Sequence, residues 1–186
     1  MPKTTGTVIF MNGASSSGKT TLAKKLQSVL SEPYFHISID AFLHQLPDAC
    51  LGDDGYLSRE LPRLLAGFNA SSAAMARVGI NVIIDHVLQE PEWIAPCVRE
   101  FKSVKVMFVA VRCPLDVLEI REQARRDRRV GLARYQYDRV HSHDAYDVEV
   151  DTSTMSVDEG VLAIREYVES DRWPTAFEKL REMRKS

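Results

Sequence analysis

The feature that most constrains the fold is an octapeptide near the start of the chain, Gly-Ala-Ser-Ser-Ser-Gly-Lys-Thr at residues 13–20. It fulfils the pattern G-x-x-x-x-G-K-[ST] at every defined position. The two glycines let the backbone curl so that successive N–H groups point at one phosphate group. Lys19 adds a positive charge for the β- and γ-phosphates, and the Thr20 hydroxyl can bind Mg²⁺. The pattern therefore predicts a site for the phosphates of a nucleotide.

The residues around this loop match its expected context, a strand before it and a helix after it. Residues 7–11 form a short apolar run typical of a strand, and residues 20–30 are apolar at helical spacing. We therefore expect the loop to bind a nucleotide in the usual way. The contacting residues expected here are Gly13, Ala14, Ser15, Ser16, Ser17, Gly18, Lys19, Thr20 and Thr21.

Further strands and helices alternate along the rest of the chain. Strands are expected at 35–39, 80–84, 104–111 and 148–150, and helices at 59–78, 91–101, 114–128, 157–169 and 174–184. Pro and Gly predict an irregular stretch over 41–58. This alternation predicts a three-layer α/β/α fold around a five-stranded parallel sheet. Ligands of such sheets bind beyond the carboxyl ends of the strands.

Composition narrows the class of protein. With 186 residues, 45% of them hydrophobic and 27% charged, the chain fits a single globular domain over residues 1–186. A net charge of −2 gives no electrostatic case for nucleic acid as a partner. No apolar run approaches the roughly 20 residues of a membrane span, and no signal peptide is expected before the first strand. Three widely spaced cysteines indicate a reducing compartment, so we expect a cytoplasmic protein. The sequence leaves a homo-oligomer open.

Two aspartates at predicted strand ends are candidates for chemistry. Asp85 follows the apolar run 82–84, a pattern that accompanies a phosphate loop and helps to hold Mg²⁺. Asp40 follows the second strand, where a carboxylate can take the proton of an acceptor hydroxyl during phosphoryl transfer. The alternative for each is a structural role as a helix cap. We expect Thr20 and Asp85 to bind the metal and Asp40 to act as catalytic base.

An arginine-rich stretch predicts a lid over the phosphates, at about residues 125–145. Arg121, Arg125 and Arg128 stand at i, i+4 and i+7 and so share one helix face. Guanidinium groups stabilise the charge that develops in phosphoryl transfer. Arg121 is expected to bind the nucleotide, and Arg125 and Arg128 are expected to act in catalysis. The alternative is a solvated face balanced by acidic neighbours such as Glu119 and Glu122.

The acceptor is constrained by what one segment lacks. Between Ser38 and Ser58 the chain has no Lys or Arg, although an anionic acceptor would need cations there. Apolar and aromatic residues in this segment favour a neutral, partly apolar small molecule, and its aspartates also allow a cationic one. These apolar residues could equally belong to the core. Arg59 and Arg63, just beyond the segment, weaken the argument.

Several blocks of the sequence resemble the chloramphenicol phosphotransferase family of P-loop kinases. These blocks occur in the same order and cover most of residues 7 to 155. They are residues 12–20 around the phosphate loop, Ser38-Ile39-Asp40-Ala41-Phe42, Val82-Ile83-Ile84-Asp85, residues 109–113 ending in Arg112-Cys113, and Tyr146-Asp147-Val148-Glu149-Val150-Asp151-Thr152. Very many enzymes share the phosphate loop, whereas the stretch 146–152, Arg112-Cys113 and the Asp40 segment occur in far fewer.

This resemblance implies a P-loop kinase fold and phosphorylation of a hydroxyl on chloramphenicol or a similar small molecule by ATP and Mg²⁺. It assigns Asp40 as the base, Lys19 and Thr20 to the triphosphate and metal, and Asp151 to the start of the loop under the adenine. An antibiotic-resistance role would follow from the family name. His86 stands where a second acidic residue is expected, and residues 171–186 form a helical extension.

Two other functions remain open from the sequence. One is a related kinase for a different hydroxyl, such as that of a nucleotide-sugar or an aminoglycoside-like molecule. The other is a nucleotide-dependent switch ATPase, which has no acceptor. Slow ATP turnover that rises with an added alcohol would distinguish the kinases from the switch.

Overall fold

The structure, a computed structural model, describes residues 5–125, 130–143, 145–170, 172 and 174–183. A five-stranded sheet runs through its centre in the order β2-β3-β1-β4-β5. Every neighbouring pair is parallel. The strands are β1 (Thr7–Asn12), β2 (Tyr34–Ser38), β3 (Asn81–His86), β4 (Lys105–Arg112) and β5 (Val148–Asp151). The predicted parallel sheet of five strands is confirmed.

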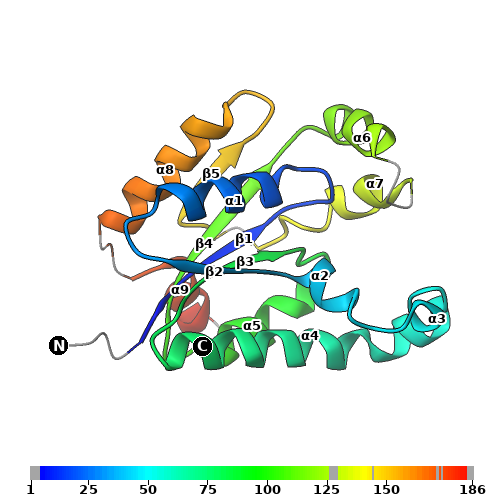
Figure 1. Cartoon of the computed structure of the whole chain (residues 1–186), viewed down its shortest axis with the longest axis horizontal. Coiled ribbons are helices and arrows are strands. Elements are labelled where there is room, and N and C mark those ends of the chain that lie inside the picture. The colour runs from blue at the N-terminus through cyan, green and yellow to red at the C-terminus, as the bar shows by residue number, and fades with distance from the viewer. Residues whose placement is uncertain (1–4, 126–129, 144, 171, 173, 184–186) are drawn as a thin grey trace.

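Helices cover both faces of the sheet, and Figure 1 shows the three layers. α1 (Lys19–Val29) and α8 (Val157–Glu169) lie on one face. α4 (Asp54–Arg77), α5 (Ile94–Glu100) and α9 (Ala176–Met183) lie on the other. Alternate side chains of β1 divide between two cores, because Val8 and Phe10 pack under α4 and α5 whereas Ile9 and Met11 pack under α1 and α8. Among the described residues, no helix is both long and apolar enough to cross a membrane.

The segment after β2 is more helical than the sequence predicts. Residues 41–58 contain α2 (Ile39–Leu43), α3 (Asp48–Leu51) and the first turns of α4, which begins at Asp54 and not near residue 59. The Asp53 carboxylate caps α4 by accepting the Tyr56 N–H at 3.0 Å. Gly55 and Pro62 lie inside α4. Local capping and packing on the sheet therefore outweigh the helix-breaking residues that made this stretch look irregular.

The segment after β4 is shorter in helix than predicted. α6 (Leu115–Ala124) ends at Ala124, and α7 (Leu132–Tyr137) follows within the predicted lid. Arg125 adopts an extended conformation as the C-cap of α6, so the i, i+4, i+7 face is not continued by α6 beyond Ala124. The expectation for Arg128 lies outside the described residues. A 3-10 turn, η1 (Pro91–Trp93), leads into α5 as the sequence indicates for residues 91–101.

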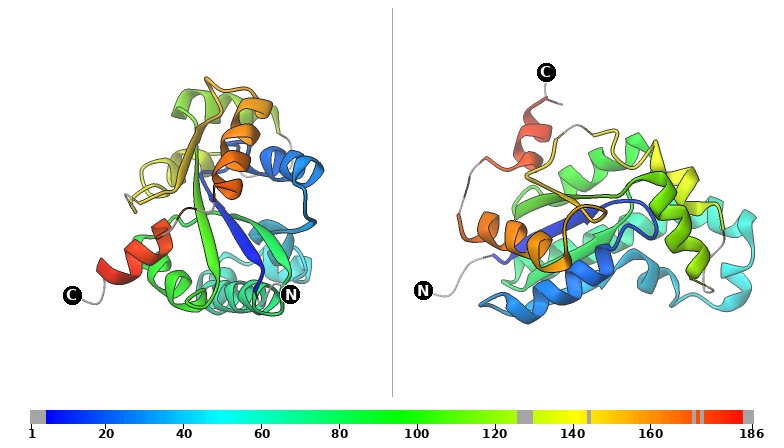
Figure 2. Two further views of the ribbon diagram at one scale, coloured as in Figure 1. Left: turned by 90° about the vertical axis from the view of Figure 1, so that its left-hand side faces the viewer. Right: turned by 90° about the horizontal axis from the view of Figure 1, so that it is seen from above.

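The C-terminal helix α9 packs into the core. Phe177 is fully buried and Leu180 nearly so, and both join the cluster between the sheet and α4. Asp147, which precedes β5, ties this helix to the sheet by accepting hydrogen bonds from the backbone N–H of Phe108 and of Ala176, each at 2.8 Å. In the two views of Figure 2, α9 stands apart from α1 and the phosphate loop.

Candidate active site

The phosphate loop joins β1 to α1 at the carboxyl end of the sheet (Figure 1). Gly13 is required by packing, because a Cβ there would lie 2.4 Å from the Val111 carbonyl oxygen. Gly18 is required by conformation, because its φ of 92° lies in the left-handed region where α1 begins. Ser16 also adopts a positive φ of 64°. These backbone positions make the curled loop that the motif predicts.

Lys19 is held inside the curl of this loop. Its side chain is largely buried, and its Nζ donates to the carbonyl oxygens of Gly13 and Ala14, each at 2.8 Å. Its Nζ also lies 4.0 Å from Asp85 Oδ1. A buried ammonium group satisfied by backbone carbonyls is preorganised at the mouth of the loop, where it can turn toward an incoming phosphate.

Thr20 and Asp85 come together from α1 and β3. The Thr20 hydroxyl donates to Asp85 Oδ2 at 2.6 Å, although the two residues are 65 positions apart. Thr20 is exposed and Asp85 is buried. A hydroxyl and a carboxylate supply two of the oxygen ligands that Mg²⁺ prefers, and its other ligands are usually waters and phosphates. Within the described ranges, no group of three or more His, Cys, Asp or Glu could hold a metal.

Asp40 lies at the same end of the sheet but in the first turn of α2, one residue past the start of that helix. The cap role that competed with catalysis belongs to Ser38, whose Oγ accepts the Ala41 N–H at 3.1 Å. Asp40 is half-buried. Burial is the main cause that lowers the pKa of His86; the charge of Lys19 lowers this pKa further and the charge of Asp40 raises it, so both groups lie within electrostatic reach of one imidazole ring.

The predicted base-binding side is formed by the start of α1, α6 and the loop after β5. Thr152 connects them, because its hydroxyl donates to the Ser17 carbonyl at 2.8 Å and accepts from Arg121 Nη1 at 2.9 Å. A cavity of about 360 Å³ lies here, lined by Gly18, Thr21, Arg121, Arg125 and Thr152 among others. Arg121 and Arg125 both line this cavity beside the phosphate loop.

Asp151 does not line that cavity. Its Oδ1 accepts the backbone N–H and the hydroxyl of Ser153, at 2.8 and 2.6 Å, and these hydrogen bonds lower the pKa of the carboxyl. Thr152, which the sequence analysis did not single out, makes the contacts to the phosphate loop instead. Asp151 shapes the turn that holds Thr152 against the phosphate loop.

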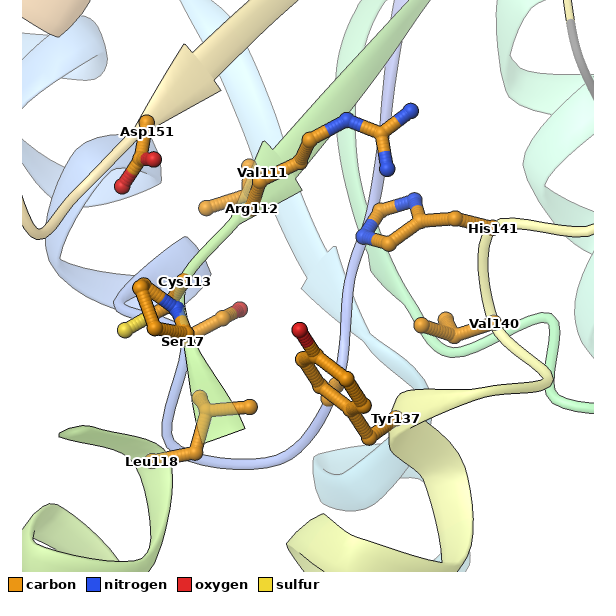
Figure 3. A pocket seen from close by; sticks show the side chains of 11 residues that line it. Ser17, Val111, Arg112, Cys113, Leu118, Tyr137, Val140, His141 and Asp151 are labelled. Atoms are coloured by element: carbon orange, nitrogen blue, oxygen red, sulfur yellow. The ribbon is translucent and has the colours of Figure 1, made fainter. Parts of the chain in front are cut away.

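A further cavity of about 320 Å³ separates the phosphate loop from the lid. In Figure 3, Tyr137 and His141 reach toward it from one side, opposite Ser17 and Cys113. Burial, and next the charge of Arg112, lower the pKa of His141 to about 4, so this ring is neutral near pH 7. The lid therefore presents uncharged polar groups to this side of the loop.

The predicted lid is held in place by three residues that the sequence did not mark as functional. Gln136 Oε1 accepts the Ser15 N–H at 2.7 Å, and the buried Glu122 accepts the N–H groups of Gly131 and Ala133 at 2.7 and 2.8 Å. Asn12 donates to the Val140 carbonyl at 2.7 Å and accepts the Leu88 N–H at 2.8 Å. Only Asn12 carried a sequence signal, since it directly precedes the phosphate loop.

Two arginines of the predicted lid form ion pairs on its exposed side, and one of these pairs joins Arg139 Nη1 to Glu90 Oε2 at 3.1 Å. Arg134 Nε donates to Glu119 Oε1 at 2.7 Å on the exposed side, which agrees with the solvated-face alternative for that residue. An arginine-rich lid that closes over the phosphates is not confirmed.

A phosphate loop with a buried lysine, a threonine–aspartate pair and a central parallel sheet define the class of P-loop nucleotide-binding proteins, to which the P-loop kinases belong. The comparisons agree with this class and narrow it. The chain belongs to the chloramphenicol phosphotransferase-like protein family (CPT), whose family model matches residues 6–169. Helix α9 lies beyond the matched residues.

A curated relative supports the same reaction class. It is named "Putative O-phosphotransferase Rv2636", from Mycobacterium tuberculosis strain H37Rv, and is 32% identical over 198 residues that cover 95% of this chain and 88% of the relative. The sequence resemblance to this family is therefore confirmed, and the chain is a phosphotransferase enzyme of the P-loop kinase type that acts on a hydroxyl group.

Solved structures of low identity share the fold. APS kinase CysC of Mycobacterium tuberculosis, in complex with AMPPNP and APS, has a TM-score of 0.71 at 17% identity and covers 91% of this chain and 99% of its own. A sugar kinase of Janibacter sp. HTCC2649 has a TM-score of 0.67 at 18% identity, covering 89% of this chain and 95% of its own.

Proposed function

We propose that the enzyme transfers the γ-phosphoryl group of ATP to a hydroxyl of a neutral, partly apolar small molecule. The observation that carries this proposal is the convergence of Lys19, the Thr20–Asp85 pair and Asp40 at one end of the sheet. The chloramphenicol phosphotransferase-like family, to which the chain belongs, supports a small-molecule acceptor.

Each residue has a proposed role in the transfer. The loop N–H groups and Lys19 bind the triphosphate and stabilise the charge on its oxygens. The acceptor oxygen forms a bond to the γ-phosphorus, the bond from that phosphorus to the β,γ-bridging oxygen breaks, and its electron pair leaves with ADP. The proton of the acceptor hydroxyl passes to the Asp40 carboxylate. Arg125, and Arg128 outside the described residues, are proposed to stabilise the transferring group.

Thr20 and Asp85 would hold Mg²⁺, directly or through water. When bound, such an ion offsets the negative charge of the β- and γ-phosphates. The 2.6 Å contact between the Thr20 hydroxyl and Asp85 Oδ2 keeps both oxygens at the loop in its absence. Arg121 and Thr152 are proposed to orient the nucleotide on the side of the base.

An ADP-release assay tests the proposal against the switch ATPase alternative. Purified protein is incubated with ATP and Mg²⁺, alone and with a panel that contains chloramphenicol, a hexose, an aminoglycoside and a nucleotide-sugar. A kinase gives slow ADP release alone and faster release with one class of alcohol. A rate that no alcohol changes would reject phosphoryl transfer, and stimulation by the nucleotide-sugar or the aminoglycoside would reject the neutral acceptor.

A further inference from the structure

A cavity of about 250 Å³ lies between α4 and α5, beside the end of β3. It is distinct from the cavities on the base side and on the lid side of the phosphate loop. Its wall is mainly apolar, with Leu65, Leu88 and Trp93 among its residues, and Asn69, His86 and Arg99 also line it. None of the roles proposed above uses this cavity.

Three buried polar atoms on this wall lack a hydrogen-bond partner among the described residues. They are the Oδ1 of Asn69 and both ring nitrogens of His86, whose ring interacts with the Val87 backbone without forming a hydrogen bond of normal geometry. His86 is 1% exposed and Asn69 is 5% exposed, so bulk water does not reach them freely. The Asn69 amide nitrogen is used, since it donates to Cys97 Sγ at 3.2 Å. Unpartnered buried polar atoms are rare in native proteins, and two of the residues that line this cavity carry three of them, which favours a polar group as part of what binds there.

The His86 ring is fixed in place and lies close to the catalytic groups. It stacks on Phe10 with ring centroids 5.4 Å apart, and Phe68 contacts it edge-on at 5.5 Å. His86 follows Asp85 directly and pairs with Asn12 in the sheet, at the mouth of the phosphate loop. The charges of Asp40 and Lys19 both act on it. His86 therefore connects the cavity to the strand end that carries Asp85 and faces the phosphate loop.

The chemistry of the wall defines what can bind. The neutral form of the His86 ring offers one hydrogen-bond donor and one acceptor. Asn69 Oδ1 offers an acceptor. Among the described lining residues Arg99 alone carries a charge, and it is exposed. A volume of about 250 Å³ is below the roughly 300–1,000 Å³ of sites that enclose a drug-sized ligand, so it would take one end of a molecule.

We propose that this cavity is a specificity subsite for the acceptor, in which Asn69 and His86 bind a hydroxyl or amide on an uncharged apolar or aromatic end. The reacting hydroxyl, on the other end of the molecule, then faces Asp40. Naming this ligand as the acceptor rests on the proposed function. An anionic end, such as a phosphate or a sugar-acid carboxylate, is excluded because the buried part of the wall offers it no cation.

The test uses small probes and no catalysis. Benzamide carries a ring and an amide that donates and accepts hydrogen bonds, whereas toluene carries the ring alone. Binding of each to the full chain is followed by NMR of ¹³C-labelled histidine rings and by titration. We expect benzamide to shift the His86 ring signals and to bind more tightly than toluene. In His86→Phe and in Asn69→Leu the benzamide Kd should rise about tenfold, because each removes a hydrogen bond but keeps the volume.

Ser71→Ala is the matched control, because Ser71 lies on the same helix but lines a different cavity, and its hydroxyl bonds the Phe68 carbonyl. It should leave both Kd values unchanged. Absence of benzamide binding, equal binding of benzamide and toluene, or unchanged binding in both variants would overturn the subsite. Probe binding does not depend on ATP, so a failed ADP-release assay with intact probe binding would reject the phosphotransfer proposal alone.

Once the panel has identified an acceptor, its KM can be measured as well. Asn69→Leu should raise the KM for that acceptor about tenfold and leave the KM for ATP unchanged.

Discussion

At the scale of single residues, the position of Lys19 inside the phosphate loop links it most directly to its proposed role in binding ATP. Its ammonium group is desolvated, and the carbonyls of Gly13 and Ala14 hold it in the loop. A charged hydrogen bond of this kind is worth about 1.5–3 kcal/mol, so Lys19→Ala should weaken ATP binding about tenfold to a hundredfold by calorimetry. Lys25→Ala is the control, since that exposed lysine pairs with Asp158 across the surface of α1 and α8. ATP binding that is equal in the two variants would contradict the loop assignment.

Acid should destabilise the protein through its buried histidines. Burial holds the pKa of His86 and of His141 near 4, below the ordinary value of 6.5. Between pH 6.5 and 4 the unfolded chain therefore binds protons that the folded chain does not, so stability falls as pH falls through this window. At about 1.36 kcal/mol per pH unit, each histidine lowers the free energy of unfolding by about 2 kcal/mol by pH 5.

Urea unfolding of the wild type and of His86→Phe at pH 7.5 and pH 5 measures this effect. On acidification, the free energy of unfolding of the variant should fall by about 2 kcal/mol less than that of the wild type, because Phe takes up no proton. At pH 7.5 it should be no less stable than the wild type beyond the cost of repacking, since the ring nitrogens have no partner in the described part of the chain. The same acid loss in both proteins would show that His86 is not buried as described.

The chemistry-bearing residues could be predicted from the sequence where a motif defines their spacing. Lys19, Thr20 and Asp85 belong to such a motif and do converge. Asn69 could not be predicted, because an asparagine inside an amphipathic helix has no spacing signal. His86 was noted as a departure from the family, but whether its nitrogens have partners depends on residues far away in sequence.

At the scale of elements, the lid depends on one buried carboxylate. Glu122 of α6 accepts the N–H groups of Gly131 and Ala133 and so caps α7. Glu122→Ala should lower the free energy of unfolding by about 2 kcal/mol and speed hydrogen exchange of those two amides.

Glu119→Ala is the control for the lid. Glu119 is on the same helix but pairs with Arg134 at the surface, and such pairs are worth about 0–1 kcal/mol. A loss of stability as large as that of Glu122→Ala would contradict a special role for Glu122. The sequence named Glu122 only in the alternative of a solvated face, because helical spacing alone does not show that α7 folds back over it.

Element boundaries were predicted well where hydrophobic spacing is regular and poorly where capping decides them. The five strands and α8 agree closely with the sequence. The start of α4 depends on the Asp53 cap, which extends the helix through Gly55 and Pro62. Local propensity gives the wrong answer there because burial of Leu65 and Phe68 against the sheet stabilises the whole helix.

At the scale of the whole molecule, Asp147 joins three layers of the fold. Its carboxylate accepts the Phe108 N–H of β4, the Tyr167 hydroxyl of α8 and the Ala176 N–H of α9, each at 2.8 Å. Asp147→Asn should lower the free energy of unfolding by about 2–4 kcal/mol, because the amide N–H₂ group would face a donor. Urea unfolding measures the loss, with Asp158→Asn on the exposed side of α8 as the control.

An Asp147→Asn protein as stable as the control would mean that α9 docks through its apolar contacts alone. The sequence grouped Asp147 with the family-like stretch 146–152 and treated residues 171–186 as an extension. The sequence could not show that Asp147 contacts the C-terminal segment, because tertiary contacts alone bring them together. The parallel sheet with helices on both faces could be predicted, since each strand reads as a separate apolar run.

The central claim is that this enzyme phosphorylates a small-molecule hydroxyl with Asp40 as the base. The most direct test is mass spectrometry of chloramphenicol after incubation with the protein, ATP and Mg²⁺, with Asp40→Asn alongside. The account predicts a phosphate-mass adduct with the wild type and its near absence with the variant, while ATP affinity stays nearly unchanged. An adduct formed equally by both proteins, or an equal loss of ATP binding in the variant, would contradict the role of Asp40. No adduct from chloramphenicol or from any alcohol of the panel would contradict the reaction itself.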